Sequence, residues 1–185
     1  MMRLFLLFNV IASIYARSST VLRIEAARNF TQVTSDNGYY TEEHTVKTED
    51  GFLLTVFRIA SRHCETTKRP PVILLHGLLE SADAWVDAGP GTGLAYLLAD
   101  GCYDTWVGNV RGNTYARRHV HLDPDKNPEF WDWSFDEIAV YDFPATIDYV
   151  LDHTQSEKVN WIGFSQGCGG LYGLNRSMCG VVRFE

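Results

Sequence analysis

Runs of apolar residues alternate with polar stretches along the chain, and their spacing separates strands from helices. Val72–Leu75 is continuously apolar, a pattern typical of a strand buried on both faces of a sheet. Tyr103–Val107 and Val159–Ile162 are further short runs that we interpret as strands. Between these runs, Leu94–Asp100 and the stretch 135–151 carry apolar residues at helical spacing. The pattern therefore predicts strands that alternate with helices.

Local signals set the limits of the two predicted helices. Gly101 follows the first helix at the position where glycine commonly ends one. Ser134 and Glu137 have the spacing of a capping box, which opens the second helix. Pro144 lies inside the second helix and should kink or restart it, with Asp142 close to the new cap.

Two β-rich segments, Glu43–Lys47 and Phe52–Ile59, precede the first buried strand. Asp50-Gly51 lies between them, and this dipeptide is a strong hairpin signal. A hairpin followed by strand, helix, strand, helix and strand is the order of an α/β sheet with parallel central strands. We therefore predict the α/β fold class.

The N-terminus has the pattern of a secretory signal peptide. A positive start at Arg3 is followed by the apolar run Leu4–Ile14, and Ala16 supplies a small residue for cleavage. We expect residues 1–16 to be removed, residues 17–42 to form an extended or partly helical arm, and no segment to span a membrane. Export would make Asn29, in Asn-Phe-Thr, a glycosylation site, and Asn175 a second candidate.

The main candidate for chemistry is the turn Gly163-Phe164-Ser165-Gln166-Gly167. It fits G-x-S-x-G, the nucleophile elbow, in which a sharp turn from strand to helix raises a serine hydroxyl above the sheet. Glycine is needed on both sides because the strand and helix backbones pass closely. We therefore assign Ser165 as the candidate catalytic nucleophile.

A serine that attacks an ester carbonyl needs backbone N–H groups that stabilise the oxyanion. One N–H comes from the residue after the nucleophile, here Gln166, and the other from the loop after the third strand. His76-Gly77-Leu78 occupies that loop, so the second donor is the N–H of Leu78. We interpret His76 as a hydrogen-bonded structural histidine and not as the general base.

Composition narrows the function classes only slightly. A hydrophobic fraction of 45% is sufficient for a packed core, and the net charge of −7 argues against nucleic acid as a partner. The spacing of Cys64, Cys102, Cys168 and Cys179 matches no metal site. We expect Cys102 and Cys168 to be buried thiols, with any pairing left open.

Several long segments in one order resemble the acid lipases, the gastric and lysosomal acid lipase-like family. The resemblance covers about residues 40–167 and rests on TEDGFLL (48–54), PVILLHGLLES (71–81), LAYLLADG (94–101), WVGNVRGN (106–113), FWDWSFDE (130–137), YDFPATIDY (141–149) and GFSQG (163–167). It implies an α/β-hydrolase fold that hydrolyses triacylglycerols or cholesteryl esters through a Ser-Asp-His triad under a lid domain.

By this resemblance Ser165 is the nucleophile, and Leu78 and Gln166 form the oxyanion hole. The expected partner is a neutral lipid or a lipid–water interface, in a secreted or lysosomal setting, with no cofactor and no metal ion. The elbow departs from the family at Phe164, where the family usually has histidine. That difference should be modest, because the backbone at this position matters most.

The end of the chain does not fit a whole enzyme of this family. In this fold the acid and the histidine of the triad follow the serine, yet no histidine follows Ser165 and the only acid is Glu185. We therefore expect residues 43–167 to be the N-terminal part of a hydrolase domain truncated after the elbow, and residues 168–185 to be an atypical tail. Such a chain should be inactive by itself, with one sheet edge uncovered.

Two other functions remain open from the sequence. One is a non-catalytic, truncated lipid-binding or regulatory product, which a downstream Asp and His would distinguish from an enzyme. The other, less favoured, is a different α/β-hydrolase chemistry such as peptide or epoxide hydrolysis, since epoxide hydrolysis in this fold usually employs an aspartate nucleophile.

Three further groups of residues have ordinary structural interpretations. We expect Arg111, Gly112 and Asn113 to brace the loop under the site. A solvated basic loop is expected to contain Arg117, Arg118, His119 and His121. Core packing or an acyl pocket would each account for Trp131 and Trp133.

Overall fold

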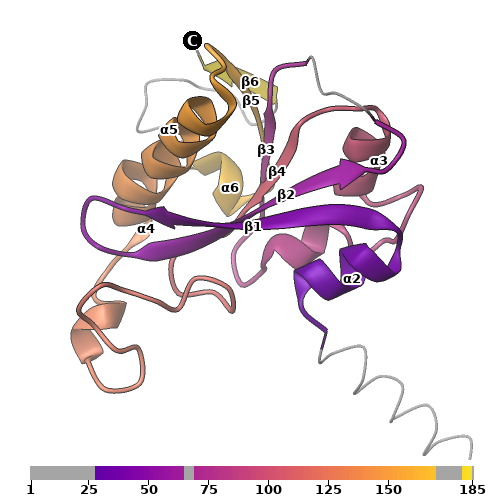
Figure 1. Cartoon of the computed structure of the whole chain (residues 1–185). Coiled ribbons are helices and arrows are strands. Elements are labelled where there is room, and N and C mark those ends of the chain that lie inside the picture. Colours follow the sequence, from indigo (N-terminus) through magenta and orange to yellow (C-terminus); the bar gives the residue numbers. More distant parts are fainter. Residues whose placement is uncertain (1–27, 65–68, 170–180, 185) are drawn as a thin grey trace, which may run out of the picture.

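A computed structural model describes residues 28–64, 69–169 and 181–184 of the chain (Figure 1). The predicted signal peptide, the start of the arm, Asn175 and Cys179 lie outside the described residues. Within those residues, no helix has the length and apolar character that crossing a bilayer requires.

The described strands form one sheet in the order β1-β2-β4-β3-β5-β6. Strands β4, β3 and β5 are parallel, whereas β1 pairs antiparallel with β2 and β2 antiparallel with β4. The bounds are β1 Tyr39–Lys47, β2 Leu53–Ser61, β3 Val72–Leu75, β4 Thr105–Gly108, β5 Val159–Gly163 and β6 Val181–Phe184. The predicted α/β fold with an opening hairpin and parallel central strands is confirmed.

The helices are mostly short. They are α2 Phe30–Asp36, α3 Leu94–Asp100, α4 Phe135–Glu137, α5 Phe143–Thr154 and α6 Gln166–Gly169, with a π-helical segment at Ile138–Asp142 and 3₁₀ turns at Ala82–Trp85 and Pro128–Trp131. Helix α2 lies within the predicted arm and starts at a capping box formed by Asn29 and Gln32, whereas residues 39–42 of the arm belong to β1.

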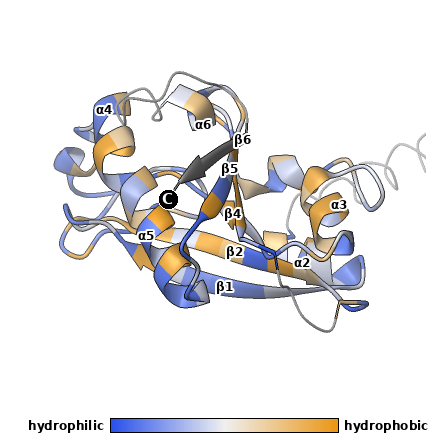
Figure 2. Ribbon diagram, turned by 90° about the horizontal axis from the view of Figure 1, so that it is seen from above, coloured by the Kyte–Doolittle hydropathy of each residue, from blue (hydrophilic) through white to orange (hydrophobic). Residues whose placement is uncertain are grey.

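Side-chain alternation along the strands builds a core on each face of the sheet. In β3, Ile73 and Leu75 join the cluster under α5, whereas Val72 and Leu74 join the cluster that contains α2 and α3. Figure 1 shows α5 on one side of the strands and α2 and α3 on the other. In Figure 2 the hydrophobic colour covers most of α3, whose Ala95, Tyr96 and Ala99 are buried.

The second predicted helix restarts at Pro144 without leaving the helical conformation. Asp142 has φ −69° and ψ −44°, and Pro144 occupies the first turn of α5. Because proline lacks an N–H donor, it disturbs the hydrogen bonds of the preceding turn. The π-helical segment takes up this change in register, and such segments are frequent at functional sites.

The chain beyond the elbow corrects one expectation. β6 pairs antiparallel with β5, from Ile162 opposite Val181 to Val159 opposite Phe184. The edge of β5 is therefore covered by a strand drawn from the atypical tail. The apolar runs of the parallel strands do not predict this strand, because it follows the serine turn and pairs back onto β5.

The cysteines correct another expectation. Cys64 and Cys102 form a disulfide, so Cys102 is not a buried thiol. The bond joins the end of the segment after β2 to the turn after α3, where Cys102 adopts φ +57°. Cys168 is buried as expected, and its thiol donates to the carbonyl of Gly163 at 3.0 Å.

Candidate functional site

Ser165 lies at the turn between β5 and α6, in the left-handed region at φ +50°. Backbone hydrogen bonds fix the turn: Phe164 N–H donates to Leu75 O at 3.0 Å, and Cys168 N–H donates to Ser165 O at 2.9 Å. A non-glycine residue at positive φ is costly, so the surrounding structure must hold it there. The side chain of Ser165 is exposed, and its hydroxyl therefore stands clear of the sheet.

Two glycines permit this turn. A Cβ at Gly163 would lie 2.2 Å from Gly167 O, and a Cβ at Gly167 would lie 2.3 Å from Leu75 O. Both contacts are with backbone atoms, which cannot rotate away as a side-chain end can. At both positions only glycine fits without moving β3, β5 or α6.

Replacing Gly167 by alanine should lower the free energy of unfolding by about 1–3 kcal/mol, because the methyl group overpacks against β3. Gly169→Ala is the matched control, since no atom lies within 4 Å of its Cβ position in the same helix. That change should be neutral or stabilising by up to about 1 kcal/mol through helix propensity. Chemical denaturation of both variants measures the difference, and equal stabilities would contradict the close approach.

The loop after β3 lies against this turn. Its Gly77 N–H donates to Glu80 Oε2 at 2.7 Å, so Glu80 holds the loop from within. Among the residues that the structure describes, the backbone N–H groups of Leu78 and Gln166 have no acceptor. Unpaired donors held by rigid neighbours can stabilise a developing negative charge.

His76 is held inside this loop as a structural residue. Its Nδ1 lies 2.8 Å from Gly77 O, and its Nε2 lies 3.0 Å from Asn113 Nδ2. These partners require that Nδ1 carries the proton and Nε2 accepts. Burial lowers the pKa of His76, which keeps the ring neutral. With both nitrogens engaged, His76 cannot take a proton from Ser165.

His119 is engaged in the same way. Its Nε2 lies 2.9 Å from Asp50 O, and its Nδ1 accepts from the N–H groups of His121 and Leu122 at 3.0 and 3.1 Å. The ring also packs edge-on against Phe52. In the described part of the chain, no side chain hydrogen bonds to the hydroxyl of Ser165.

A cleft of about 1060 Å³ opens beside the serine turn. Leu78 and Gln166 border it, and Trp131 and Trp133 form part of its wall. Trp133 also packs against the core, whereas Trp131 is 44% exposed, and an acyl pocket stays a prediction. A second hollow of about 500 Å³ is bordered by Ser165 itself and shares Leu78 and Gln166 with the cleft.

Exposed hydrophobic side chains lie around the two hollows and the serine turn. We call Leu78, Leu79, Phe135, Val140 and Phe164 the apolar rim; each is more than half exposed, and Leu79 is 97% exposed. Contiguous apolar surface on a folded protein usually marks a site that contacts another apolar body.

Beneath the cleft, Arg111 braces the loop that follows β4. The guanidinium is 1% exposed and binds two carboxylates: Nε donates to Asp142 Oδ1 at 2.8 Å, and Nη1 donates to Asp50 Oδ2 at 2.6 Å. The guanidinium carbon Cζ also lies 4.1 Å from the ring centre of Phe52. The interpretation of Arg111 as a brace is confirmed. Asn113 stabilises the same loop through its hydrogen bonds with His76 and Asn109.

Burial raises the pKa of Asp142 to about 6, although the Arg111 guanidinium and backbone N–H both act to lower it. An aspartate in the unfolded chain has a pKa of about 3.9. The folded state therefore binds the proton of the Asp142 carboxyl more tightly than the unfolded state does. The stability that this protonated carboxyl contributes is present below pH 4 and lost as the pH rises through 6.

We expect the stability of the wild type, relative to Asp142→Asn, to fall by on the order of 2 kcal/mol between pH 4 and pH 7. The reason is that asparagine removes the titrating group while keeping the size of the side chain. Denaturation curves of both proteins across this pH range measure the change. A difference that is constant with pH, or that grows as the pH rises, would contradict the raised pKa.

Sequence reasoning missed three acidic residues that hold the site in place. Glu80 binds the Gly77 N–H, while Asp50 and Asp142 bind Arg111. The position of Glu80, three residues after Gly77, was the one local signal. The partners of Arg111 lie far away in the sequence, so no spacing rule identifies them.

Comparison with known families and proteins gives two matching families. Residues 30–89 match the partial alpha/beta-hydrolase lipase region, and residues 70–171 match the alpha/beta hydrolase fold. Together the two matches include the loop after β3, the cleft and the serine turn.

Curated relatives are similar over most of this chain. The gastric triacylglycerol lipase of Mus musculus is 47% identical over 146 residues, which cover 77% of this chain and 37% of the relative. Lipase member K of Homo sapiens is 46% identical, covering 77% and 36%, and Lipase 1 of Drosophila melanogaster is 49% identical, covering 73% and 29%. The matched part of the chain thus spans 29–37% of the length of these relatives.

Among solved structures, an esterase from Pyrococcus furiosus has a similar fold. Its TM-score is 0.57 at 19% identity, and the match covers 81% of this chain and 51% of the esterase. At this identity the likeness concerns the fold alone.

Proposed function

Because the chain belongs to the α/β-hydrolase fold family and matches the N-terminal part of acid lipases, we propose that it supplies the nucleophile and oxyanion hole of a lipid-ester hydrolase. The Ser165 hydroxyl oxygen attacks the ester carbonyl and its proton passes to a general base. The bond between the carbonyl carbon and the alcohol oxygen then breaks, which releases the alcohol and leaves an acyl-enzyme. The N–H groups of Leu78 and Gln166 stabilise the oxyanion that develops in the attack.

The observation that carries the proposal is the arrangement of donors at the turn. Ser165 is exposed at positive φ, and two N–H groups without acceptors lie on the elements that flank it. A turn held at positive φ by close glycines has a conformational cost, and such strain persists where the surrounding structure enforces it, often at a reactive site. Loss of one oxyanion donor in a serine hydrolase typically lowers the rate by about 10²–10³.

The substrate class that fits best is a neutral lipid ester, such as a triacylglycerol or a cholesteryl ester. The apolar rim offers contact to acyl chains or to a lipid–water interface. The cleft beside it is lined by hydrophobic and aromatic side chains, Trp131 and Trp133 among them, and also by charged ones such as Asp87. Relatives at 47% identity bear the name gastric triacylglycerol lipase. We accordingly place the protein in a secreted or lysosomal setting, where its disulfide would persist.

A second candidate is lipid binding without turnover. It is favoured by one observation: both ring nitrogens of His76 and of His119 already have partners, so neither ring is available as a general base. Hydrolysis then requires a base other than these two histidines. A serine without its base is a weak nucleophile at neutral pH.

The test uses protein recovered from cells that secrete it. A fluorophosphonate probe, followed by peptide mapping, should give an adduct on Ser165, and trioleoylglycerol or cholesteryl oleate should be hydrolysed in emulsion. An adduct on another residue would contradict the assigned nucleophile. Binding of lipid esters with neither an adduct nor turnover would favour the second candidate.

A further inference from the structure

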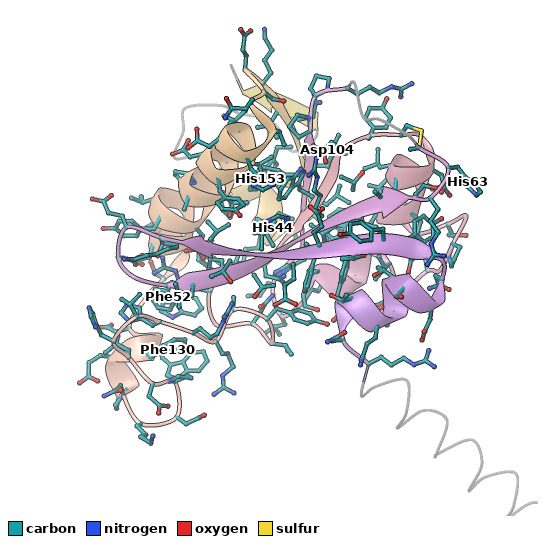
Figure 3. The ribbon with its side chains drawn as sticks, viewed as in Figure 1. His44, Phe52, His63, Asp104, Phe130 and His153 are labelled. Carbon is teal, nitrogen blue, oxygen red and sulfur yellow. A yellow bond between two sulfur atoms is a disulfide. The ribbon has the colours of Figure 1, made fainter. Side chains whose placement is uncertain are left out.

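A cluster of metal-ligating side chains lies between β1 and α5, outside the proposed active site. Glu42 and His44 are alternate residues of β1 and point to the same face, while His153 lies in the last turn of α5. One ligand atom from each residue lies within 4.8 Å of the other two. Figure 3 shows His44 and His153 beside each other between the helix and the strand, and their ring centres are 4.8 Å apart.

The spacing within this cluster suits a metal ion. His44 Nε2 lies 3.3 Å from Glu42 Oε2. Two ligands bound to zinc at about 2.0–2.1 Å in tetrahedral geometry are separated by about 3.3 Å, so these atoms need little movement. His153 is exposed, so a small rotation of its side chain is enough to bring a ring nitrogen into the site.

Neighbouring aromatic residues orient the ligands. Tyr149 Oη lies 3.0 Å from His44 Nδ1, the nitrogen that faces away from Glu42. The Tyr149 ring also stacks on His153 at an interplanar angle of 18°. Fully buried Trp106 lies beneath both histidines. A hydrogen-bond partner on the second ring nitrogen is the usual support of a metal-bound histidine.

The charges nearby permit a cation. Arg58 is the cation nearest to the cluster, with Nη1 3.5 Å from Glu42 Oε2. Its guanidinium is already paired with Asp104, through contacts of 2.7 and 3.0 Å. The cluster together with this pair therefore has a net charge of −1 when its histidines are neutral.

We propose that Glu42, His44 and His153 bind a divalent transition-metal ion, with Zn²⁺ as the best match. Two imidazoles and one carboxylate are ligands that zinc accepts, and three protein ligands leave a fourth position for water. The ion would join α5 to β1. The site is separate from Ser165, because α5 leads into the start of β5 whereas Ser165 follows the end of that strand.

The experiment titrates chelator-treated protein with ZnCl₂ and follows binding by calorimetry and the melting temperature. We expect one Zn²⁺ per chain and a rise in melting temperature, because a metal that binds only the folded state stabilises it. His153→Gln should weaken binding by about 100-fold, and Tyr149→Phe by about 10-fold through loss of a supporting contact. His153 is exposed, so its substitution should leave the fold intact, which circular dichroism verifies.

His63→Gln is the matched control, because His63 is exposed and lies outside the cluster (Figure 3). It should bind Zn²⁺ as the wild type does. The proposal is overturned if the wild type does not bind at millimolar Zn²⁺. It is equally overturned if folded His153→Gln binds with unchanged affinity, or if His63→Gln and His153→Gln lose affinity equally.

Discussion

In a form of the protein that also carries the triad acid and histidine, replacing Ser165 by alanine should lower lipid-ester hydrolysis by about 10⁶-fold and abolish labelling by a fluorophosphonate. The size of the effect follows from the role of the residue, since removing the nucleophile of a serine hydrolase removes the acyl-enzyme route altogether. Alanine tolerates the φ of +50° as well as serine does, so the turn should keep its shape. Initial rates on emulsified trioleoylglycerol, measured with protein from secreting cells, give the comparison.

Ser35→Ala serves as the control for this substitution. Ser35 is exposed on α2, on the opposite face of the sheet from α5, and its loss should leave rate and labelling unchanged. Labelling and turnover that both persist in Ser165→Ala at wild-type levels would refute the assignment of the nucleophile. Similar losses in both variants would point instead to a general fault in the protein preparation.

Replacing Arg111 by methionine should destabilise the protein by about 3–5 kcal/mol. The change keeps much of the side-chain volume but removes the cation from two carboxylates, of which Asp142 is 1% exposed. Breaking a buried ion pair from one side leaves an uncompensated charge away from water, and this accounts for most of the loss. Natural domains have about 5–15 kcal/mol of stability in total, so this variant should be markedly less stable to urea.

The matched control is Arg117→Met. Arg117 pairs with Asp125 at 2.6 Å, but both side chains are largely exposed, so the cost should be about 0–1 kcal/mol. Combining Arg111→Met with Asp50→Asn and Asp142→Asn should recover part of the stability, because the unpaired charges are then absent. A loss in Arg111→Met no larger than that in Arg117→Met would show that the brace is not energetically important.

The central strands, the helix α3 and the hairpin could be predicted from the sequence, because the patterns that indicate them involve residues close together in the chain. The apolar run Val72–Leu75 is β3, and the helix at Leu94–Asp100 has the same bounds as predicted. Asp50-Gly51 joins the predicted hairpin, where Gly51 adopts φ +100°. Each of these features depends on residues close together in the chain, so propensity and spacing suffice to identify it.

Features that depend on distant partners were not predictable in the same way. The disulfide, the antiparallel strand β6 and the two carboxylates of Arg111 each join segments far apart in the sequence. The cluster of Glu42, His44 and His153 is of the same kind. At the candidate site, the pattern predicted Ser165, Leu78 and Gln166, whereas only the structure revealed that Glu80 restrains the loop of Leu78.

Whether the disulfide between Cys64 and Cys102 forms depends on the cells in which the protein is produced. The bond closes a loop with a sequence separation of 38 residues, which contains β3, α3 and the loop with Leu78. In the chain-entropy model a crosslink of this span stabilises the folded state by about 4 kcal/mol. Protein made in a reducing cytosol would lack it, and Leu78 of the proposed oxyanion hole would then lie on a segment with less restraint. A preparation that is inactive for this reason would look, in an ester assay, like a protein without catalytic function.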